Sequence, residues 1–124
     1  PAEEYPSEYK ACTEVAKEEL EKEIYREVRN DLPDLARYDT IFIGVPVWWH
    51  TVPAVVQGVL KNHEKDFNGK TVIPFVTYGA TYRDETLAKL VELTPGARHL
   101  TGFGTRNPSR VETDAWLKRI SVIK

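Results

Sequence analysis

The sequence predicts an α/β fold in which helices cover a parallel sheet. One helical pattern opens the chain, and three strand-like runs follow, each succeeded by a helical pattern. The first strand-like run, Thr40 to Val45, is β-branched and aromatic without alternation, which predicts a strand buried on both faces. The length of 124 residues suits one domain with its own core, so we expect residues 1–124 to form a single domain.

A helix is predicted for residues 9–28. Its apolar residues recur at intervals of three and four, and so form one stripe on a helix of about 3.6 residues per turn. They are Tyr9, Cys12, Val15, Ala16, Leu20, Ile24 and Val28. Ser7 is expected to cap the first turn, because its hydroxyl can accept a hydrogen bond from a free backbone N–H. Charged residues on the opposite face predict exposure to solvent.

Three pairs of a strand and a helix follow. The strands are predicted at residues 40–45, 71–77 and, more weakly, 99–105, and the helices at residues 53–62, 84–93 and 111–123. Pro74 lies inside the middle strand. Because proline has no N–H to donate, one side of that strand is expected to be unpaired or irregular.

Composition and motifs argue against several classes of protein. The net charge is -2 with both signs interspersed, so no basic stripe points to nucleic acid. No apolar run is long enough for a membrane span and no signal peptide pattern opens the chain, so we expect a cytoplasmic protein without a membrane partner. Cys12 is the only cysteine, which excludes an internal disulfide. No metal-ligand spacing and no nucleophile motif is present, so no metal or catalytic residue is assigned.

Two loops at the carboxyl ends of neighbouring predicted strands are rich in aromatic residues. Trp48 and Trp49 follow the first strand, and Tyr78 and Tyr82 follow the second. Ligands bind at this edge of open parallel sheets, so the loops predict a slot with flat apolar walls that suits a planar ligand. His50 lies in the first loop, where it could touch such a ligand. In the alternative interpretation, one tryptophan packs into the core beside the helix at residues 53–62.

Three motifs carry a family resemblance. They are YDTIFIGVPVWW at residues 38–49, GKTVIPF at residues 69–75 and TYG at residues 77–79. Together with Pro53 they resemble the flavodoxin family, specifically the short-chain flavodoxins in which a strand ends in a Pro-x-Trp-Trp loop. The resemblance covers nearly the whole chain. It implies a flavodoxin-like three-layer sandwich around a doubly wound parallel sheet, which binds FMN and passes electrons through its isoalloxazine ring.

The same resemblance implies which residues contact the flavin ring. One side is flanked by the loop Pro46, Val47, Trp48 and Trp49, and the other side and polar edge by Thr77, Tyr78, Gly79 and Ala80. Ala80 stands where relatives often have glycine, which narrows the freedom of the backbone near the ring.

The chain departs from the family at its start. Members begin with a strand and a Ser/Thr-rich loop whose backbone N–H groups hold the FMN phosphate, and no such segment is present. The resemblance therefore implies an N-terminally truncated domain that lacks the first two strands and the phosphate-binding loop. The absence of Met indicates either removal of an initiator or a piece of a longer chain. Losing charge-assisted hydrogen bonds of roughly 1.5–3 kcal/mol each is expected to weaken FMN binding.

A missing first strand would expose the edge of the strand from Thr40 to Val45. We expect either a homodimer through this edge or a first helix that folds over it. Two functional hypotheses follow. In the first, the chain is an FMN-binding electron-transfer protein or small flavin-dependent reductase that meets a redox partner protein, and Trp48, Trp49 and Tyr78 hold the ring. In the alternative, it binds FMN weakly or not at all and acts as a dimerising or interaction module.

Overall fold

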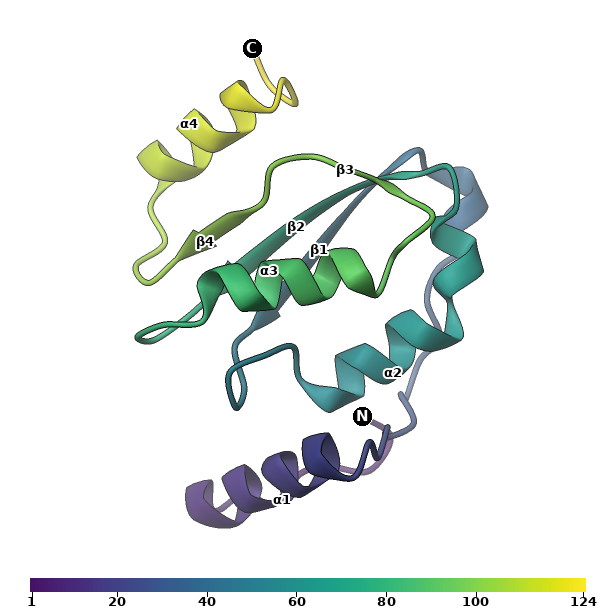
Figure 1. Cartoon of the computed structure of the whole chain (residues 1–124), viewed down its shortest axis with the longest axis vertical. Helices are drawn as coiled ribbons and strands as arrows, with labels where there is room; N and C mark the ends of the chain where they lie inside the picture. The colour runs from purple at the N-terminus through teal and green to yellow at the C-terminus, as the bar shows by residue number, and fades with distance from the viewer.

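A four-stranded parallel sheet forms the centre of the fold, which a computed structural model describes for all residues, Pro1–Lys124 (Figure 1). The elements are α1 (Tyr9–Glu21), β1 (Thr40–Pro46), α2 (Ala54–Asn62), β2 (Thr71–Thr77), α3 (Arg83–Glu92), β3 (Arg98–His99), β4 (Phe103–Thr105) and α4 (Arg110–Arg119). Short 3-10 helices, Leu35–Arg37 and Glu64–Phe67, precede β1 and β2. None of the four α-helices combines the length and apolar character that spanning a membrane requires. The prediction of an α/β fold with a parallel sheet is confirmed.

The central strand is β2, and Pro74 decides how its partners are arranged. On one side β2 pairs with β1 along the full length of both strands. On the other side β3 ends with His99 opposite Val72, and β4 begins with Phe103 opposite Phe75. The break between β3 and β4 therefore falls opposite Pro74, which has no N–H to hold a partner strand. The expected irregularity is confirmed, and the single strand predicted at residues 99–105 is two short strands.

Two helices, α2 and α3, cover one face of the sheet (Figure 1). Side chains alternate between the faces of a strand, and Val45, Val72 and Val76 point to this side with no more than 5% of their surface exposed. They join Leu60 of α2 and Leu90 of α3 in the main hydrophobic core. The first helix, α1, lies against α2. The core thus fixes the carboxyl ends of β1 and β2 relative to the helices around them.

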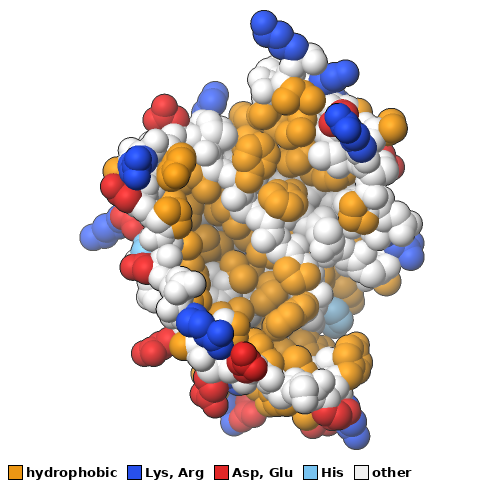
Figure 2. Space-filling model, turned by 180° about the vertical axis from the view of Figure 1, so that it is seen from behind, with side chains coloured by type: hydrophobic (Ala, Val, Ile, Leu, Met, Phe, Trp, Pro, Cys, Tyr) orange, Lys and Arg blue, Asp and Glu red, His pale blue; other side chains and the backbone are white.

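The opposite face of the sheet is covered only in part, by α4. Trp116 of this helix is 4% exposed and stacks on Phe103 with the ring centroids 4.9 Å apart. The ring of Phe42 on β1 meets Trp116 edge-on, yet 43% of Phe42 remains exposed. The prediction that β1 is buried on both faces is therefore wrong, because α4 reaches over β4 and does not extend across β1. Figure 2 shows hydrophobic side chains gathered over the middle of the molecule on this side.

The ends of α1 differ from the sequence prediction. The N-terminal cap is Glu8, whose carboxylate accepts hydrogen bonds from two backbone N–H groups of the first turn at 3.1 and 2.8 Å, so the prediction of a Ser7 cap is wrong. The helix ends at Glu21 instead of residue 28, because Glu23 has a φ of 52° and lies outside the helical region. The part of the apolar stripe that was predicted for residues 22–28 therefore does not form.

After α1 the chain turns back beside the N-terminal residues. The backbone N–H of Ala2 donates to the carbonyl of Glu27 at 2.7 Å. Glu19, only 4% exposed, accepts a hydrogen bond from the Tyr5 hydroxyl at 2.7 Å and also pairs with Arg26. Burial and this hydrogen bond raise the pKa of Tyr5. The buried carboxylate thus accounts for the shape of the segment, since it gathers partners from before and after the helix.

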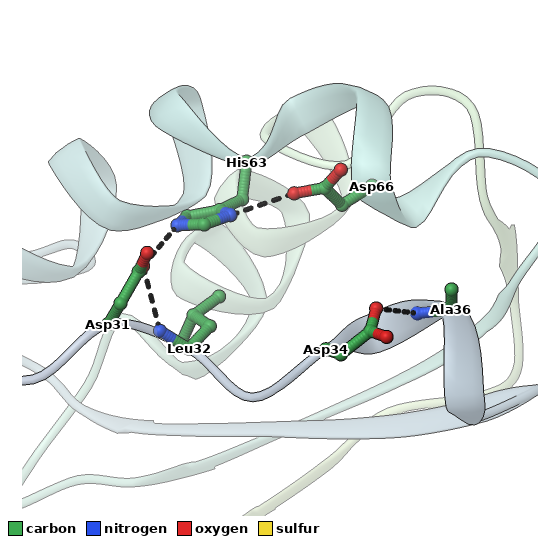
Figure 3. Close-up of polar contacts among 6 residues, drawn as sticks. All are labelled: Asp31, Leu32, Asp34, Ala36, His63 and Asp66. Carbon is green, nitrogen blue, oxygen red and sulfur yellow. Dashed lines mark hydrogen bonds and ion pairs between the residues drawn. The ribbon is translucent and has the colours of Figure 1, made fainter.

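His63 ties the segment before β1 to the end of α2 (Figure 3). Its Nδ1 lies 2.8 Å from a carboxylate oxygen of Asp66, and its Nε2 lies 2.9 Å from one of Asp31. The hydrogen bonds to Asp66 and Asp31 raise the pKa of His63 against the opposing effect of partial burial. The tie is therefore strongest when the imidazole is protonated.

Candidate functional site

A cavity of about 790 Å³ opens at the carboxyl ends of β1 and β2. It is lined by Val47, Trp48, Trp49 and His50 after β1, by Gly79, Ala80, Thr81 and Tyr82 after β2, and by Tyr9, Cys12, Thr13 and Ala16 in the N-terminal helix. Hydrophobic residues make up 8 of these 12. The two aromatic loops predicted to form a slot are therefore brought together, and α1 adds a third wall.

The loop after β1 makes a tight turn that presents its aromatic residues. Trp48 and Thr51 exchange backbone hydrogen bonds of 3.0 and 3.3 Å. Between them, Trp49 and His50 have φ values of 49° and 72°. Positive φ at both central residues is typical of a type I′ turn, which favours glycine and asparagine. Each of these two residues therefore carries a backbone strain of about 1 kcal/mol or more.

Both tryptophans are held by contacts outside the core. The indole N–H of Trp49 donates to the backbone carbonyl of Thr13 in α1 at 2.7 Å, and Lys17 Nζ lies 5.3 Å from the Trp49 ring centroid. Trp48 meets the ring of Tyr5 edge-on, with the centroids 5.5 Å apart. Trp49 is still 41% exposed. The two side chains thus line the cavity from positions fixed by α1 and the N-terminal segment.

The loop after β2 is joined to the first loop by an aromatic stack. The rings of His50 and Tyr82 lie 4.0 Å apart at an interplanar angle of 24°. Tyr82 has a φ of 70° and stands just before α3, where its carbonyl accepts a hydrogen bond from the Thr86 hydroxyl at 2.7 Å. Three of the five non-glycine residues with positive φ, Trp49 among them, therefore line this one cavity.

The comparison with known families identifies the fold. The sequence model of a family described as Flavodoxin matches residues 9–120, which include every helix and strand described above. The chain belongs to the flavodoxin family. The resemblance predicted from the motif at residues 38–49 is thereby confirmed. The search of curated proteins found no match.

Several solved structures are similar to this flavodoxin-family chain. A protein from Bacteroides uniformis described as a flavoprotein is 31% identical with a TM-score of 0.77, and the match covers 95% of this chain and 77% of that one. A second one, from Bacteroides eggerthii, is 24% identical with a TM-score of 0.77 over 100% of this chain and 79% of that one. A flavoprotein from Lactobacillus acidophilus in complex with FMN is 20% identical with a TM-score of 0.70 over 90% of this chain and 72% of that one.

The flavodoxin-type loops place the eight candidate residues in three positions. Those that line the aromatic cavity are Val47, Trp48, Trp49, Gly79 and Ala80. Pro46 and Thr77 are paired with each other at the ends of β1 and β2, outside the cavity wall. Tyr78 lines a different cavity, between β4 and α4. Successive side chains in a strand, and at the first position beyond it, point to opposite faces of the sheet. Neighbouring residues of one motif therefore face different sides.

The residues of α1 that line the cavity were not found from the sequence. Cys12 was assigned only to the apolar stripe of the first helix, whereas it is partly exposed and borders the cavity. Thr13 and Ala16 carried no signal of their own. Their place depends on how α1 packs against α2 and the loop after β1, which a local pattern does not specify.

The lining suits a flat, uncharged ring. No Lys, Arg, Asp or Glu borders the cavity, and its polar side chains are Thr13, Thr81 and His50. Its volume lies within the range of about 300–1,000 Å³ that is usual for small-molecule sites. The residues present therefore fit a tricyclic ring such as isoalloxazine, but they offer no cation to a phosphate group.

Proposed function

We propose that this chain is an FMN-binding electron-transfer flavoprotein domain, with the flavin ring in the cavity between the two aromatic loops. The observation that carries the proposal is the apolar lining of that cavity at the carboxyl edge of a flavodoxin-type sheet. FMN, when bound, supplies the reversible uptake of electrons. The FMN complex of the structurally similar protein from Lactobacillus acidophilus supports this choice of ligand.

The chain's own contribution is to hold and orient the ring. Trp48 and Trp49 offer flat faces, and stacking of aromatic rings is worth about 0.5–1.5 kcal/mol beyond the area buried. Gly79 and Ala80 bring the backbone of the second loop to the opposite wall, where their N–H groups and the carbonyl of Ala80 are available to a flavin edge, while the carbonyl of Gly79 accepts from Arg106. Removing the ring from water is the main source of affinity in such a lining.

The strained backbone supports the same location. Trp49, His50 and Tyr82 all adopt left-handed conformations around the cavity. Strain of this kind persists where the surrounding contacts fix it, and it concentrates at ligand sites. Here the contacts are the Trp49 hydrogen bond to Thr13 and the stack of His50 on Tyr82.

This cavity offers no cationic partner to the phosphate of FMN, because neither Lys nor Arg is among the residues that line it. The ring site is therefore expected to contribute equally to the binding of riboflavin and of FMN. Titration of the protein with each flavin, followed by quenching of flavin fluorescence, tests the proposal. Saturable quenching at about 10 μM or below supports it, whereas none up to about 1 mM contradicts it.

A variant pair localises the binding. Trp49→Ala removes one wall and is expected to weaken riboflavin binding about tenfold. Tyr38→Ala removes an aromatic ring that is 48% exposed outside the cavity, and should leave binding unchanged. Thermal unfolding followed by circular dichroism establishes that both variants are folded. Equal losses in the two variants would place the flavin elsewhere.

A second role, association of two copies through β1, is favoured by the open edge of this strand. In the sheet β1 pairs only with β2, and Phe42 beside the free edge is 43% exposed. Two such edges can pair about a two-fold axis. We expect a dimer in sedimentation experiments at about 10 μM and a monomer for Phe42→Lys, because an edge lysine opposes strand pairing. A monomeric parent protein would contradict this role.

A further inference from the structure

A second cavity lies on the other side of the loop that follows β2. It has a volume of about 640 Å³ and lies between the end of β4, the face of α4 and Tyr78. Tyr78 is tied to β4 by a backbone hydrogen bond of 3.2 Å to the carbonyl of Thr105. Residues 79–82, on the same loop, line the aromatic cavity. The loop is thus a common wall between the two cavities.

Three arginines converge on this second cavity from separate segments. Arg83 comes from the start of α3, Arg106 from the loop after β4, and Arg119 from the last turn of α4. Glu112 is the only acidic residue in the lining. The cavity lining is therefore positively charged, although the whole chain has a formal net charge of -2.

Most of the guanidinium donors have no acceptor within the chain. Arg106 and Arg119 form no ion pair, and Arg83 forms one through Nε, 2.9 Å from a carboxylate oxygen of Asp84. Each guanidinium has five N–H groups in a planar fork. Several donors therefore remain free to point at one ligand.

Two of the three arginines are held in place by their surroundings. The Nε of Arg106 donates to the backbone carbonyl of Gly79 at 2.8 Å, which leaves its terminal nitrogens available. The aliphatic stem of Arg83 lies directly over Gly104 in β4, in space that any Cβ at this position would fill. Glycine at 104 thus makes room for the side chain of Arg83 to cross the strand into the cavity.

We infer that this cavity binds the phosphate or carboxylate group of a small molecule through Arg83, Arg106 and Arg119. A guanidinium matches two oxygens of such a group with two parallel hydrogen bonds, which makes arginine the preferred side chain for planar recognition of anions. All three arginines are exposed to solvent, so salt screens their attraction for an anion, and binding is strongest at low ionic strength. The inference does not depend on flavin binding in the aromatic cavity.

Titration calorimetry with inorganic pyrophosphate at low ionic strength tests the site. We expect saturable binding, and about a tenfold loss of affinity for Arg119→Gln, which removes a charge-assisted interaction from the exposed surface of α4. Arg37→Gln is the matched control, because Arg37 is exposed, forms no ion pair and lies before β1 at the opposite end of the sheet. This control should bind as the parent does.

Two further variants separate a built site from general attraction to positive charge. Glu112→Gln removes the single carboxylate from the lining and should strengthen pyrophosphate binding. Gly104→Ala displaces the stem of Arg83 without changing any charge, and should weaken binding. No saturable binding up to about 10 mM pyrophosphate, or the same loss in Arg119→Gln and Arg37→Gln, would overturn the inference.

The anionic group could belong to FMN itself or to a separate phosphorylated molecule. Parallel titrations of Arg119→Gln with FMN and with riboflavin distinguish these sources. Weaker binding of FMN with unchanged binding of riboflavin assigns the site to the FMN phosphate across the shared loop. Unchanged binding of both flavins, together with weaker binding of pyrophosphate, assigns it to a separate ligand.

Discussion

Replacing Glu19 with alanine perturbs the contact network that holds Tyr5 against Trp48, which lines the aromatic cavity. Glu19 is 4% exposed and accepts hydrogen bonds from the Tyr5 hydroxyl and from Arg26. Removing one partner of a buried ion pair typically destabilises a protein by about 3–5 kcal/mol. The Arg26 side chain is 17% exposed, so water reaches part of the freed charge, which lowers the expected loss to about 2–3 kcal/mol.

Glu19→Ala should also lower the affinity of the aromatic cavity for riboflavin. Tyr5 packs edge-on against Trp48, so releasing Tyr5 also frees one wall of the cavity. Urea unfolding followed by circular dichroism measures the loss of stability, and riboflavin titration measures the loss of affinity. Glu18→Ala is the matched control, since its carboxylate pairs with Lys22 on the exposed face of α1. If Glu19→Ala is as stable as Glu18→Ala, the buried network does not hold this segment.

Three further predictions follow from the structure. His63 has a raised pKa because of its carboxylate partners, so its stabilisation is complete below the usual value of 6.5 and is lost as the pH rises through the raised pKa. The stability difference between parent and His63→Gln, measured by urea unfolding, should therefore be larger at acidic than at alkaline pH. Burial lowers the pKa of His99, so the parent should lose stability as the pH falls below 6.5, and His99→Gln should lose less. Gly44→Ala places a Cβ against the Phe75 ring and should destabilise by about 1–3 kcal/mol in thermal unfolding, whereas Gly79→Ala, with no atom within 4 Å of the added Cβ, should be nearly neutral.

Local sequence patterns were sufficient for the layout of the sheet. The unbroken apolar run of β1 and the proline in β2 predicted a parallel pair with an irregular second neighbour, and both features are present. Helices α2 and α3 lie within one residue of their predicted bounds, because Pro53 marks the start of α2 and Pro95 and Gly96 follow the end of α3. The helix predicted at residues 111–123 is instead α4, which ends at Arg119, before the positive φ of 62° at Ser121. These signals are local, so they do not depend on how the elements pack.

The features that sequence reasoning missed depend on long-range contacts. The apolar stripe predicted α1 to continue to Val28, but Glu19 attracts Arg26 from beyond the helix and the chain turns back at Glu23. Exposure of Phe42 could not be predicted either, because it depends on how far α4 reaches across the sheet.

The candidate site was predicted only in part, because one of its three walls also depends on long-range packing. The Pro-x-Trp-Trp motif located the first wall correctly, and Gly79 and Ala80 located the second. Tyr78 faces the other cavity because the chain alternates in direction at the end of β2. The third wall comes from α1, whose packing position had no local signal.

Nuclear Overhauser effects between a bound flavin and the protein examine the proposed ring site at atomic level. With riboflavin added to the protein, the account predicts contacts from the ring methyl protons to the indole protons of Trp48 and Trp49 and to the Ala80 methyl group. Contacts instead to Phe103 and Trp116, on the partly covered face of the sheet, would contradict it.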